Sequence, residues 1–366
     1  MQFSIQREVL LKPLQQVAGV VERRHTLPVL ANILVQVDEG RVALSGSDLE
    51  VEMVARAVVE DASAGDTTLP ARKLLDLVRA LPDGAQLKFA LKNDKVTMQA
   101  GRSRYTLATL PASEFPTTDE IEVIERIRLP QATLKHLIDS TSFAMANQDV
   151  RFYLNGLLLD LNERKLRCVA TDGHRLALAE AALDAAVSSS RQIIIPRKGV
   201  TELAGLFEAA DGDVQIEFGR NHIRVHKGDV VFTSKLIDGR FPDYESVIPI
   251  GADQIALVPR DALRACLSRA SILSNEKYRG VRLGFSPGKL QIVAHNPEQE
   301  EAIEELEVES AIEDLAIGFN VGYLLDALAV LESDKVRLCL RDPQSSLLIQ
   351  DGEHDRVRHV VMPLRL

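Results

Sequence analysis

The chain has 366 residues, of which 46% are hydrophobic and 26% charged, a composition typical of a globular protein with two or three domains. Its 53 acidic and 43 basic residues give a net charge of −10, so any contact with nucleic acid requires cations segregated onto one surface. Trp is absent and aromatic residues total only 4%, which argues against stacking platforms for single-stranded bases.

The first third of the chain predicts a helix, a hairpin and a second helix. An apolar pattern begins at Leu11 and continues through Leu14 and Ala18. Segments 32–37 and 41–45 then flank Asp38-Glu39-Gly40, which is a hairpin signal. Further on, Leu74, Leu77, Val78 and Leu81 fit the i, i+3, i+4, i+7 spacing of a helix.

The same patterns recur twice along the chain. The first helical pattern returns at 134–141 and 263–270, and the second at 200–207 and 324–331. Each second helix carries an acid in register, namely Asp76, Glu202 and Asp326. Strand pairs are predicted again at 157–161 with 165–170, at 281–285 with 289–294, and at 214–218 with 222–226.

This long-period similarity indicates three copies of one unit. Each copy has two helices and several antiparallel strands, so we expect an α+β fold. The predicted domains are residues 1–124, 125–252 and 253–366. At about 120 residues, each has enough chain to form a core of its own.

Several short motifs accompany the repeat: Thr171-Asp172-Gly173-His174-Arg175-Leu176, Phe241-Pro242-Asp243-Tyr244, Ser274-Asn275-Glu276-Lys277, Asn296-Pro297-Glu298-Gln299-Glu300-Glu301 and Met362-Pro363-Leu364-Arg365-Leu366. With three tandem units, they resemble the bacterial replicative sliding clamp, the β subunit of DNA polymerase III. The likeness runs from the first residue to the last. It implies three clamp domains that form a ring as a head-to-tail dimer.

The resemblance implies that the helices face a central hole that holds duplex DNA. The residues implied to contact DNA are Arg24, Gln148, Tyr153, Arg197 and Lys198, with Arg23 as an alternative to Arg24. A dense cationic lining would bind DNA tightly and in a salt-dependent way. A few weak phosphate contacts inside a closed ring would instead permit sliding without dependence on sequence.

Opposite charges in the first and third units suit a head-to-tail contact. Surface charge without any role in assembly would give the same sequence pattern. Lys73, Arg102 and Arg104 lie in the first unit, and an acidic run lies in the third. The resemblance implies a dimer interface with Tyr105, Ile272 and Leu273 at its apolar centre and with Glu298, Glu300, Glu301 and Glu304 in the acidic run.

The C-terminal segment 359–366 is apolar almost to its end, which predicts packing, either as a final edge strand or beside a groove. The resemblance implies a hydrophobic groove between the second and third units, formed by Leu154, Thr171, Gly173, His174, Arg175, Leu176, Pro242, Val247, Ser346, Val360, Met362, Pro363, Leu364 and Arg365. Its implied ligands are short motifs of the replicative polymerase, the clamp loader, and other polymerases and repair proteins. Ser246 and Leu364 depart from the family pattern, in which a basic residue and a methionine are common.

No catalytic or metal-binding motif is apparent. Asp172 and His174 lack a nucleophile with a positioned base, and His222 and His226 fall in a strand pattern without a third ligand. Gly284 and Gly288 lie in a hairpin pattern. We therefore expect no enzyme activity, no cofactor and no metal. An enzyme that uses His174, or a monomeric peptide-binding scaffold without a DNA role, would be the alternatives.

The three cysteines point to a reducing compartment. Cys168, Cys266 and Cys339 are far apart and odd in number, so a disulfide framework is not expected. The sequence begins without a cationic stretch followed by an apolar core, and no apolar run approaches the ~20 residues of a membrane span. We expect a cytoplasmic, nucleoid-associated protein without a membrane partner.

Overall fold

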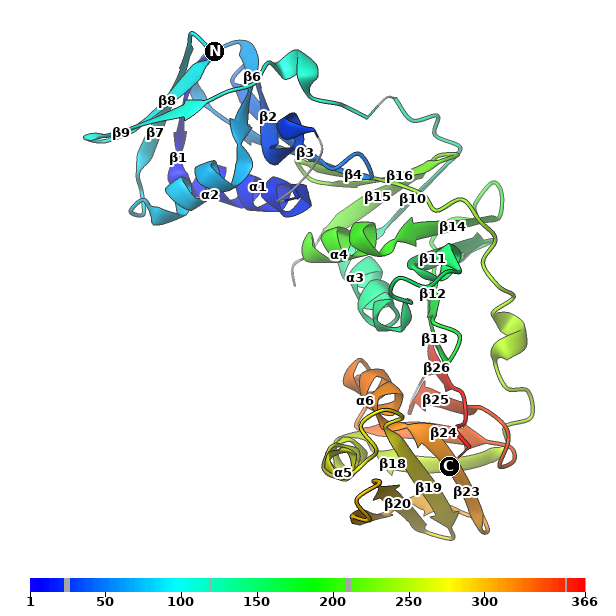
Figure 1. The fold of residues 1–366 in the computed structure, drawn as a ribbon. Helices are drawn as coiled ribbons and strands as arrows, with labels where there is room; N and C mark the ends of the chain where they lie inside the picture. Colours follow the sequence, from blue (N-terminus) through cyan, green and yellow to red (C-terminus); the bar gives the residue numbers. More distant parts are fainter. Residues whose placement is uncertain (23–26, 119, 208–211, 353, 366) are drawn as a thin grey trace. The chain divides into compact units, whose positions relative to one another are not determined.

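The computed structural model describes residues 1–366 except 23–26, 119, 208–211, 353 and 366. The chain forms two compact units, Met1–Ala132 with Lys198–Leu236, and Thr133–Arg197 with Ile237–Leu366. Both units combine helices with antiparallel sheets, as Figure 1 shows, so the predicted α+β class is confirmed.

The order of elements repeats three times, beginning each time with a strand that leads directly into a helix. The first copy consists of β1 (Gln2–Gln6), α1 (Arg7–Val20), β2 (Asn32–Asp38), β3 (Arg41–Ser47), β4 (Val51–Val58), β5 (Glu60–Ser63), β6 (Gly65–Pro70), α2 (Ala71–Ala80), β7 (Gln86–Lys92), β8 (Lys95–Ala100) and β9 (Ser103–Ala108). The second consists of β10 (Glu125–Pro130), α3 (Gln131–Asp139), β11 (Gly156–Asn162), β12 (Lys165–Thr171), β13 (Arg175–Ala182), β14 (Arg191–Pro196), α4 (Arg197–Gly205), β15 (Asp213–Phe218), β16 (His222–Lys227) and β17 (Val230–Lys235).

The third copy consists of β18 (Gln254–Pro259), α5 (Arg260–Ile272), β19 (Gly280–Ser286), β20 (Lys289–His295), β21 (Glu301–Glu307), β22 (Glu309–Ser310), β23 (Leu315–Asn320), α6 (Val321–Ala329), β24 (Lys335–Leu340), β25 (Leu347–Asp351) and β26 (Val357–Val361). All the helices and hairpins predicted from the sequence are therefore confirmed. Four of the strands that precede helices, β6, β10, β14 and β18, end in proline. Proline lacks a backbone N–H for a sheet, and its fixed φ suits the start of a helix.

The first unit contains two sheets. A five-stranded sheet has the order β5-β1-β7-β8-β9, and an eight-stranded sheet has the order β10-β15-β16-β17-β4-β3-β2-β6. Helix α1 packs against α2 and against β3 and β4, and it buries Leu10, Leu14 and Val17. The predicted apolar face of this helix is thus the face that covers the sheet.

The second unit also contains two sheets. A nine-stranded sheet has the order β14-β11-β12-β13-β26-β25-β24-β18-β22, and a four-stranded sheet has the order β21-β20-β19-β23. Helix α5 packs against α6, β20 and β21, as the second unit in Figure 1 also shows. Every helix among the described residues is too short or too polar to pass through a bilayer.

The two largest sheets each join strands of successive repeats. In the first unit β17 pairs with β4, with Phe232 opposite Met53, and in the second unit β26 pairs with β13, with Val360 opposite Leu176. The two compact units consequently divide the strands of the middle repeat between them. Backbone hydrogen bonds therefore continue the two largest sheets from one repeat into the next.

Strand β26 buries a titratable side chain. His359 is 1% exposed, its Nε2 lies 3.0 Å from the carbonyl oxygen of Ser140, and its ring packs edge-on against Phe143. Burial lowers the pKa of His359 from 6.5 to about 4, and its hydrogen bond to the Ser140 carbonyl opposes this only in part. The folded protein therefore keeps this ring neutral at pH 7.

We expect this histidine to make the protein less stable in mild acid. Below pH 6.5 the unfolded state binds a proton that the folded state accepts only near pH 4, so the free energy of unfolding falls as pH is lowered through that window. The maximum loss is about 3 kcal/mol. Urea unfolding at pH 7.5 and pH 5 should show a smaller loss for His359→Gln than for the wild type, and equal losses would contradict the assignment.

Candidate functional site

A tight turn between β12 and β13 carries several of the predicted groove residues. Thr171 Oγ1 accepts a hydrogen bond from the backbone N–H of Gly173 (3.1 Å) and donates one to the carbonyl of Arg175 (2.6 Å). Asp172 Oδ1 accepts hydrogen bonds from the backbone N–H groups of His174 (2.9 Å) and Arg175 (3.1 Å). Gly173 has φ +88°, a conformation that side-chain-bearing residues rarely adopt, which explains the glycine in this motif.

Arg175 is fixed by contacts on several sides. Its Nε donates to Asp172 Oδ2 (3.1 Å), and its two terminal nitrogens donate to Asp326 Oδ2 on α6 (2.5 Å) and to the carbonyl of Phe143 (3.0 Å). The guanidinium also lies 4.6 Å from the ring centre of Tyr323. Arg175 therefore holds β13 against α6 and shapes the site through its backbone and neighbours.

The C-terminal residues continue from β26 along the same turn. The backbone N–H of Met362 donates to the carbonyl of His174 (2.9 Å), and Ser346 Oγ lies 3.1 Å from Met362 Sδ. The backbone N–H of Leu364 then donates to the carbonyl of Gly318 on β23 (2.8 Å). Strand β26 lies inside its sheet, between β13 and β25, so the alternative of a final edge strand is wrong.

An apolar cluster forms the floor beneath this turn. Leu154, Leu176 and Val360 are each at most 2% exposed and belong to one buried cluster, against which Tyr153 and Val247 pack. Met362, Pro363 and Leu364 are half-buried, while Gly173, His174, Pro242 and Arg365 are exposed. The structure thus brings Leu154, Leu176, Val247 and Val360 into one cluster, with the turn and the C-terminal segment joined to it. We call this set of predicted residues the C-terminal groove.

The candidate DNA-contacting residues differ in solvent exposure and in their contacts within the protein. In the second unit, Gln148 is exposed at a positive φ of +56°, and Tyr153 is half-buried. Arg197 donates hydrogen bonds to the carbonyls of Met145 (2.6 Å) and Ala146 (3.1 Å), and so fixes the loop after α3. Arg24 and its alternative Arg23 lie outside the described residues.

Lys198, in the first unit, is enclosed by carboxylates. Its Nζ forms ion pairs with Glu22 (2.7 Å) and with the buried Asp48, and it donates to the carbonyl of Val20 (3.3 Å). Partial burial lowers the pKa of Lys198, but its hydrogen bonds to Asp48 and Glu22 outweigh this and raise the pKa above its ordinary value. Two carboxylates thus offset its charge, which leaves less attraction for phosphate than a free lysine would have.

The helices as a group are nevertheless cationic. The six α-helices carry eleven Lys and Arg residues against six Asp and Glu residues, although the whole chain has a charge of −10. Helix α5 alone contributes Arg260, Arg264 and Arg269. The helices therefore have a net positive charge within an acidic chain, although most of its 43 basic residues lie outside them.

The predicted dimer residues lie near edge strands of opposite charge. In the first unit β9 is an edge strand, and Arg102 and Arg104 are exposed in and beside it, with Tyr105 half-buried and Lys73 exposed on α2. In the second unit β21 is an edge strand that includes Glu301 and Glu304, with Glu298 and Glu300 exposed just before it.

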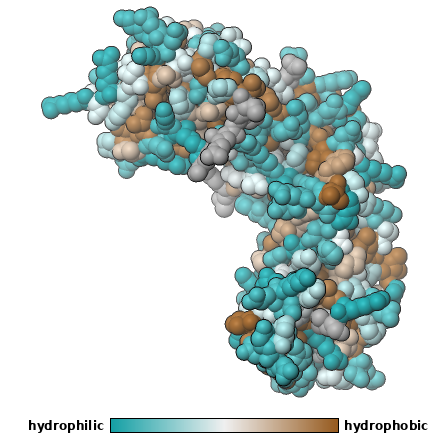
Figure 2. All heavy atoms as spheres, viewed as in Figure 1, coloured by the Kyte–Doolittle hydropathy of each residue, from teal (hydrophilic) through white to brown (hydrophobic). Residues whose placement is uncertain are grey.

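The apolar residue expected at the centre of this contact is open to solvent. Ile272 is 77% exposed at the end of α5, and Leu273 beside it is half-buried. On the face shown in Figure 2 most of the surface is hydrophilic, and apolar side chains gather in small patches. Glu304 differs from its neighbours because both of its oxygens accept hydrogen bonds from Arg269 of the same chain (2.7 and 2.6 Å).

The sequence did not predict the residues that hold the C-terminal groove together. Asp326, Tyr323 and Phe143 fix Arg175, and only the acid at 326 left a signal, because it recurs in register in all three repeats. The carboxylates around Lys198 gave no signal. Ion pairs between residues far apart in the chain depend on tertiary contacts that no local pattern encodes.

The side chains of Asp172 and His174, considered above for catalysis, already have structural partners. Asp172 receives two backbone N–H groups and the Arg175 side chain, and His174 stacks on Tyr323 with ring centres 6.4 Å apart. His222 and His226 lie on β16, as predicted, and His226 faces Glu217 at 3.1 Å. Among the residues that the structure describes, no group of three or more His, Cys, Asp or Glu side chains is placed to hold a metal ion.

Known proteins match this sequence and structure over the whole chain. Family models of the DNA polymerase III β subunit match residues 1–119 (N-terminal domain), 128–243 (central domain) and 245–365 (C-terminal domain). The β sliding clamps of Pseudomonas aeruginosa and Escherichia coli are 53% and 48% identical, with both chains fully covered. A crystal structure of the Pseudomonas aeruginosa clamp bound to griselimycin matches with a TM-score of 0.98 at 52% identity, and one from Caulobacter crescentus with 0.93 at 38%, again over the full length of both chains.

Proposed function

This chain belongs to the family of DNA polymerase III β subunits, the β sliding clamps, which are processivity factors and not catalytic enzymes, and we propose that two copies close head to tail into a ring around duplex DNA. The ring tethers the replicative polymerase to its template. The observation that carries this proposal is the excess of basic residues on the six helices of an acidic chain. Six repeats with these helices turned inward surround the duplex with cations, while the acidic remainder repels it.

The candidate DNA contacts suit sliding better than tight binding. Gln148 and Tyr153 are uncharged, and Arg197 and Lys198 already have partners within the protein. Each full phosphate contact would add affinity and salt dependence, whereas contacts this weak leave the ring mobile. Arg24, or Arg23, completes the proposed set. Retention on DNA then depends on ring closure, and a nucleoid-associated location follows from it.

Two edge strands of opposite charge support the dimer. Strand β9 of one protomer, with Arg102 and Arg104, pairs with β21 of its partner, because both strands lack a neighbour on one side within their own sheets. The pairing satisfies backbone groups that would otherwise stay exposed. Exposed ion pairs contribute only about 0–1 kcal/mol each, so burial of Ile272, Leu273 and Tyr105 supplies most of the affinity.

The three predicted domains, 1–124, 125–252 and 253–366, are the units of this ring. A mass measurement in solution tests its assembly. We expect a species of twice 40.3 kDa at micromolar concentration, because the two edge strands and Ile272 need a partner. A monomer of 40.3 kDa under these conditions would contradict the proposed ring.

The C-terminal groove is the proposed docking site for the replicative polymerase, the clamp loader, and other polymerases and repair proteins. Each presents a short linear motif that lays apolar side chains on the half-buried Val247, Met362, Pro363 and Leu364, next to the buried Leu154, Leu176 and Val360. An apolar floor with a few polar groups for orientation suits peptide recognition, and the flexible thioether of Met362 adapts to motifs of different shape. Ser246 is exposed and donates to the carbonyl of Asp243 (2.7 Å), so it adds no charge at the rim.

A further inference from the structure

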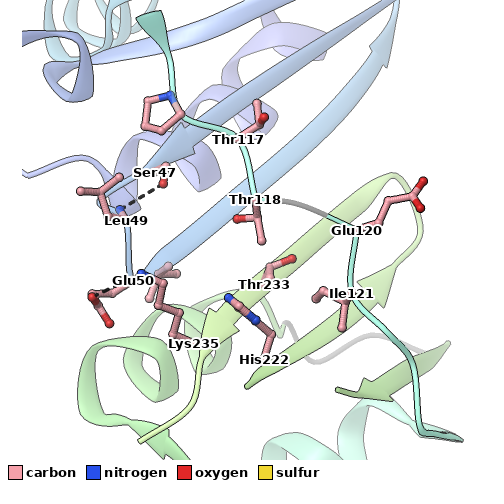
Figure 3. Close-up of a pocket in the computed structure, with 12 residues that line it drawn as sticks. Ser47, Leu49, Glu50, Thr117, Thr118, Glu120, Ile121, His222, Thr233 and Lys235 are labelled. Atoms are coloured by element: carbon pink, nitrogen blue, oxygen red, sulfur yellow. Dashed lines mark hydrogen bonds and ion pairs between the residues drawn. The ribbon is translucent and has the colours of Figure 1, made fainter. Parts of the chain in front are cut away.

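A second pocket lies beside the turn between β3 and β4 in the first unit, with a volume of about 260 Å³. Its wall includes Ser47, Glu50, Pro116, Ile121, Thr233 and Lys235. Figure 3 shows Thr118, Thr233 and Ile121 around its centre, with Lys235 and His222 at one side and Glu120 directed away. We call it the β3–β4 pocket.

The turn at this pocket has the same hydrogen bonds as the turn in the C-terminal groove. Ser47 Oγ accepts from the N–H of Leu49 (3.1 Å), as Thr171 does from Gly173. Asp48 Oδ1 accepts from the N–H groups of Glu50 (2.9 Å) and Val51 (2.6 Å), as Asp172 does from the residues after it. Leu49 also has a positive φ, +77°, like Gly173 at +88°. The two turns are one motif repeated.

The neighbouring segments repeat as well. Strand β17 pairs with β4 as β26 pairs with β13, and the N–H of Lys235 donates to the carbonyl of Glu50 (2.8 Å) just as that of Met362 does to His174. Phe115-Pro116 corresponds to Phe241-Pro242, and five residues after each proline stands an apolar side chain, Ile121 and Val247. The pocket is therefore the counterpart, in the first unit, of the C-terminal groove.

The floor of the pocket is polar where that of the groove is apolar. Leu176 opposite Val360 in the groove corresponds to Glu52 opposite Thr233 in the pocket, and Met362 corresponds to Lys235. Thr233 and Lys235 line the pocket, and Glu52 lies on the same face of the sheet as its cross-strand partner Thr233. The same backbone cradle thus presents a carboxylate where the groove presents leucine.

Glu52 is a buried acid without a cationic partner. It is 8% exposed, and its Oε2 accepts one hydrogen bond, from the N–H of Thr118 (3.2 Å). Lys235 instead pairs with Glu50 (3.8 Å), and Arg224 donates to Thr233 Oγ1 (3.2 Å). In the described part of the chain no basic side chain lies within 4.0 Å of the Glu52 carboxylate. A cationic side chain that reached this carboxyl group would supply the charged partner that it lacks.

His222 does not supply that cation near neutral pH. Burial lowers the pKa of His222, and the positive charges of Lys235 and Arg224 lower it further, against a weaker opposing effect from Glu50. The titratable groups that line the pocket are Glu50, Glu120, His222 and Lys235. Glu52 adjoins them as the cross-strand partner of Thr233, and Arg224 donates to the hydroxyl of Thr233.

We propose that the β3–β4 pocket is a second peptide-docking site, and that it takes an extended segment whose anchor is an arginine or lysine side chain paired with Glu52. The inference rests on the proposed docking role of the C-terminal groove. The hydroxyl groups of Ser47, Thr118 and Thr233 and the half-buried ring of Pro116 receive the rest of the segment. Each chain then carries two docking sites of opposite chemistry, one for apolar anchors and one for basic anchors.

A selection from displayed random heptapeptides on the full-length protein tests this. Binders are first depleted on the Glu52→Leu variant, which removes every peptide that uses the C-terminal groove. The peptides that survive should carry Arg or Lys at one fixed position. Their affinity, measured by fluorescence anisotropy, should fall at least tenfold in the isosteric variant Glu52→Gln. It should be unchanged in Glu39→Gln, because Glu39 is exposed in the turn between β2 and β3 and does not line the pocket.

The outcomes separate clearly. Depletion of every binder, or survivors with apolar anchors or with affinity unchanged in Glu52→Gln, would overturn the second site. Competition by arginine amide alone at the concentrations that the peptides require would mean a small-cation pocket and would also overturn it. The peptides that the Glu52→Leu protein removes test the C-terminal groove independently. If the groove binds no peptide, no such peptides will be recovered. Equal thermal unfolding of all three variants and the wild type shows that folding is retained.

Discussion

Removal of the last five residues, Met362–Leu366, should abolish the binding of partner motifs and leave the dimer intact. Met362 is held at the groove by its N–H bond to His174 and by Ser346, and Leu364 by its bond to Gly318. Their loss removes one wall of the site, while Leu176 and Val360 stay in their sheet and Leu154 stays in the short 3-10 helix before β11. A single buried anchor contact contributes about 2 kcal/mol or more, so we expect at least a thirtyfold loss of affinity.

Fluorescence anisotropy with labelled peptides from candidate partners measures this loss. Asp355→Ala serves as a matched control, because Asp355 is exposed just before β26 and lies outside the groove. The control should bind as the wild type does. Affinity retained by the truncated protein would refute the assignment of the groove. A monomeric truncated protein would show that the C-terminal segment supports assembly instead.

Substitution of Ile272 by glutamate should convert the ring to monomers and remove its hold on DNA. Ile272 is 77% exposed in the single chain, and the proposed interface buries it. A carboxylate there loses the burial of an isoleucine, worth about 1.5–3 kcal/mol, and adds an unpaired charge to a desolvated centre.

The chain offers a close control for this substitution. Ile250 is 86% exposed and belongs to the segment that precedes β18, outside the proposed interface. Ile250→Glu makes the same chemical change and should remain a dimer of twice 40.3 kDa. If Ile272→Glu also remains a dimer, the apolar centre of the interface has been placed wrongly.

Local patterns predicted most of the fold because they concern neighbouring residues. The apolar spacing at Leu74, Leu77 and Val78 and the hairpin signal at Asp38-Glu39-Gly40 each depend on a short stretch of chain, and both α2 and the β2–β3 hairpin formed where expected. The long repeat also predicted three copies of the unit correctly. Pairing of β17 with β4 and of β26 with β13 could not be predicted in this way, because it joins segments well over a hundred residues apart.

Side-chain roles in the candidate site were harder to predict than its position. The resemblance implied that Lys198 contacts DNA and that Arg175 forms part of the groove. In the structure Lys198 pairs with Glu22 and Asp48, and Arg175 pairs with Asp172 and Asp326. The repeat offers the explanation, because Asp48 and Asp172 occupy equivalent turns in successive repeats. Each aspartate forms an ion pair with a basic side chain. One cation comes from a helix and the other from the next strand, which a sequence pattern cannot distinguish.

Retention on DNA of different topology tests the central claim most directly. The wild-type protein is loaded onto nicked circular DNA with its loader, the free protein is removed, and the circle is then cut once. We predict that the protein stays on the circle, even in salt that screens phosphate contacts, and is lost after the cut because it slides off the ends. Persistence on the linear molecule with free ends, or loss from the intact circle at the same rate, would contradict encirclement.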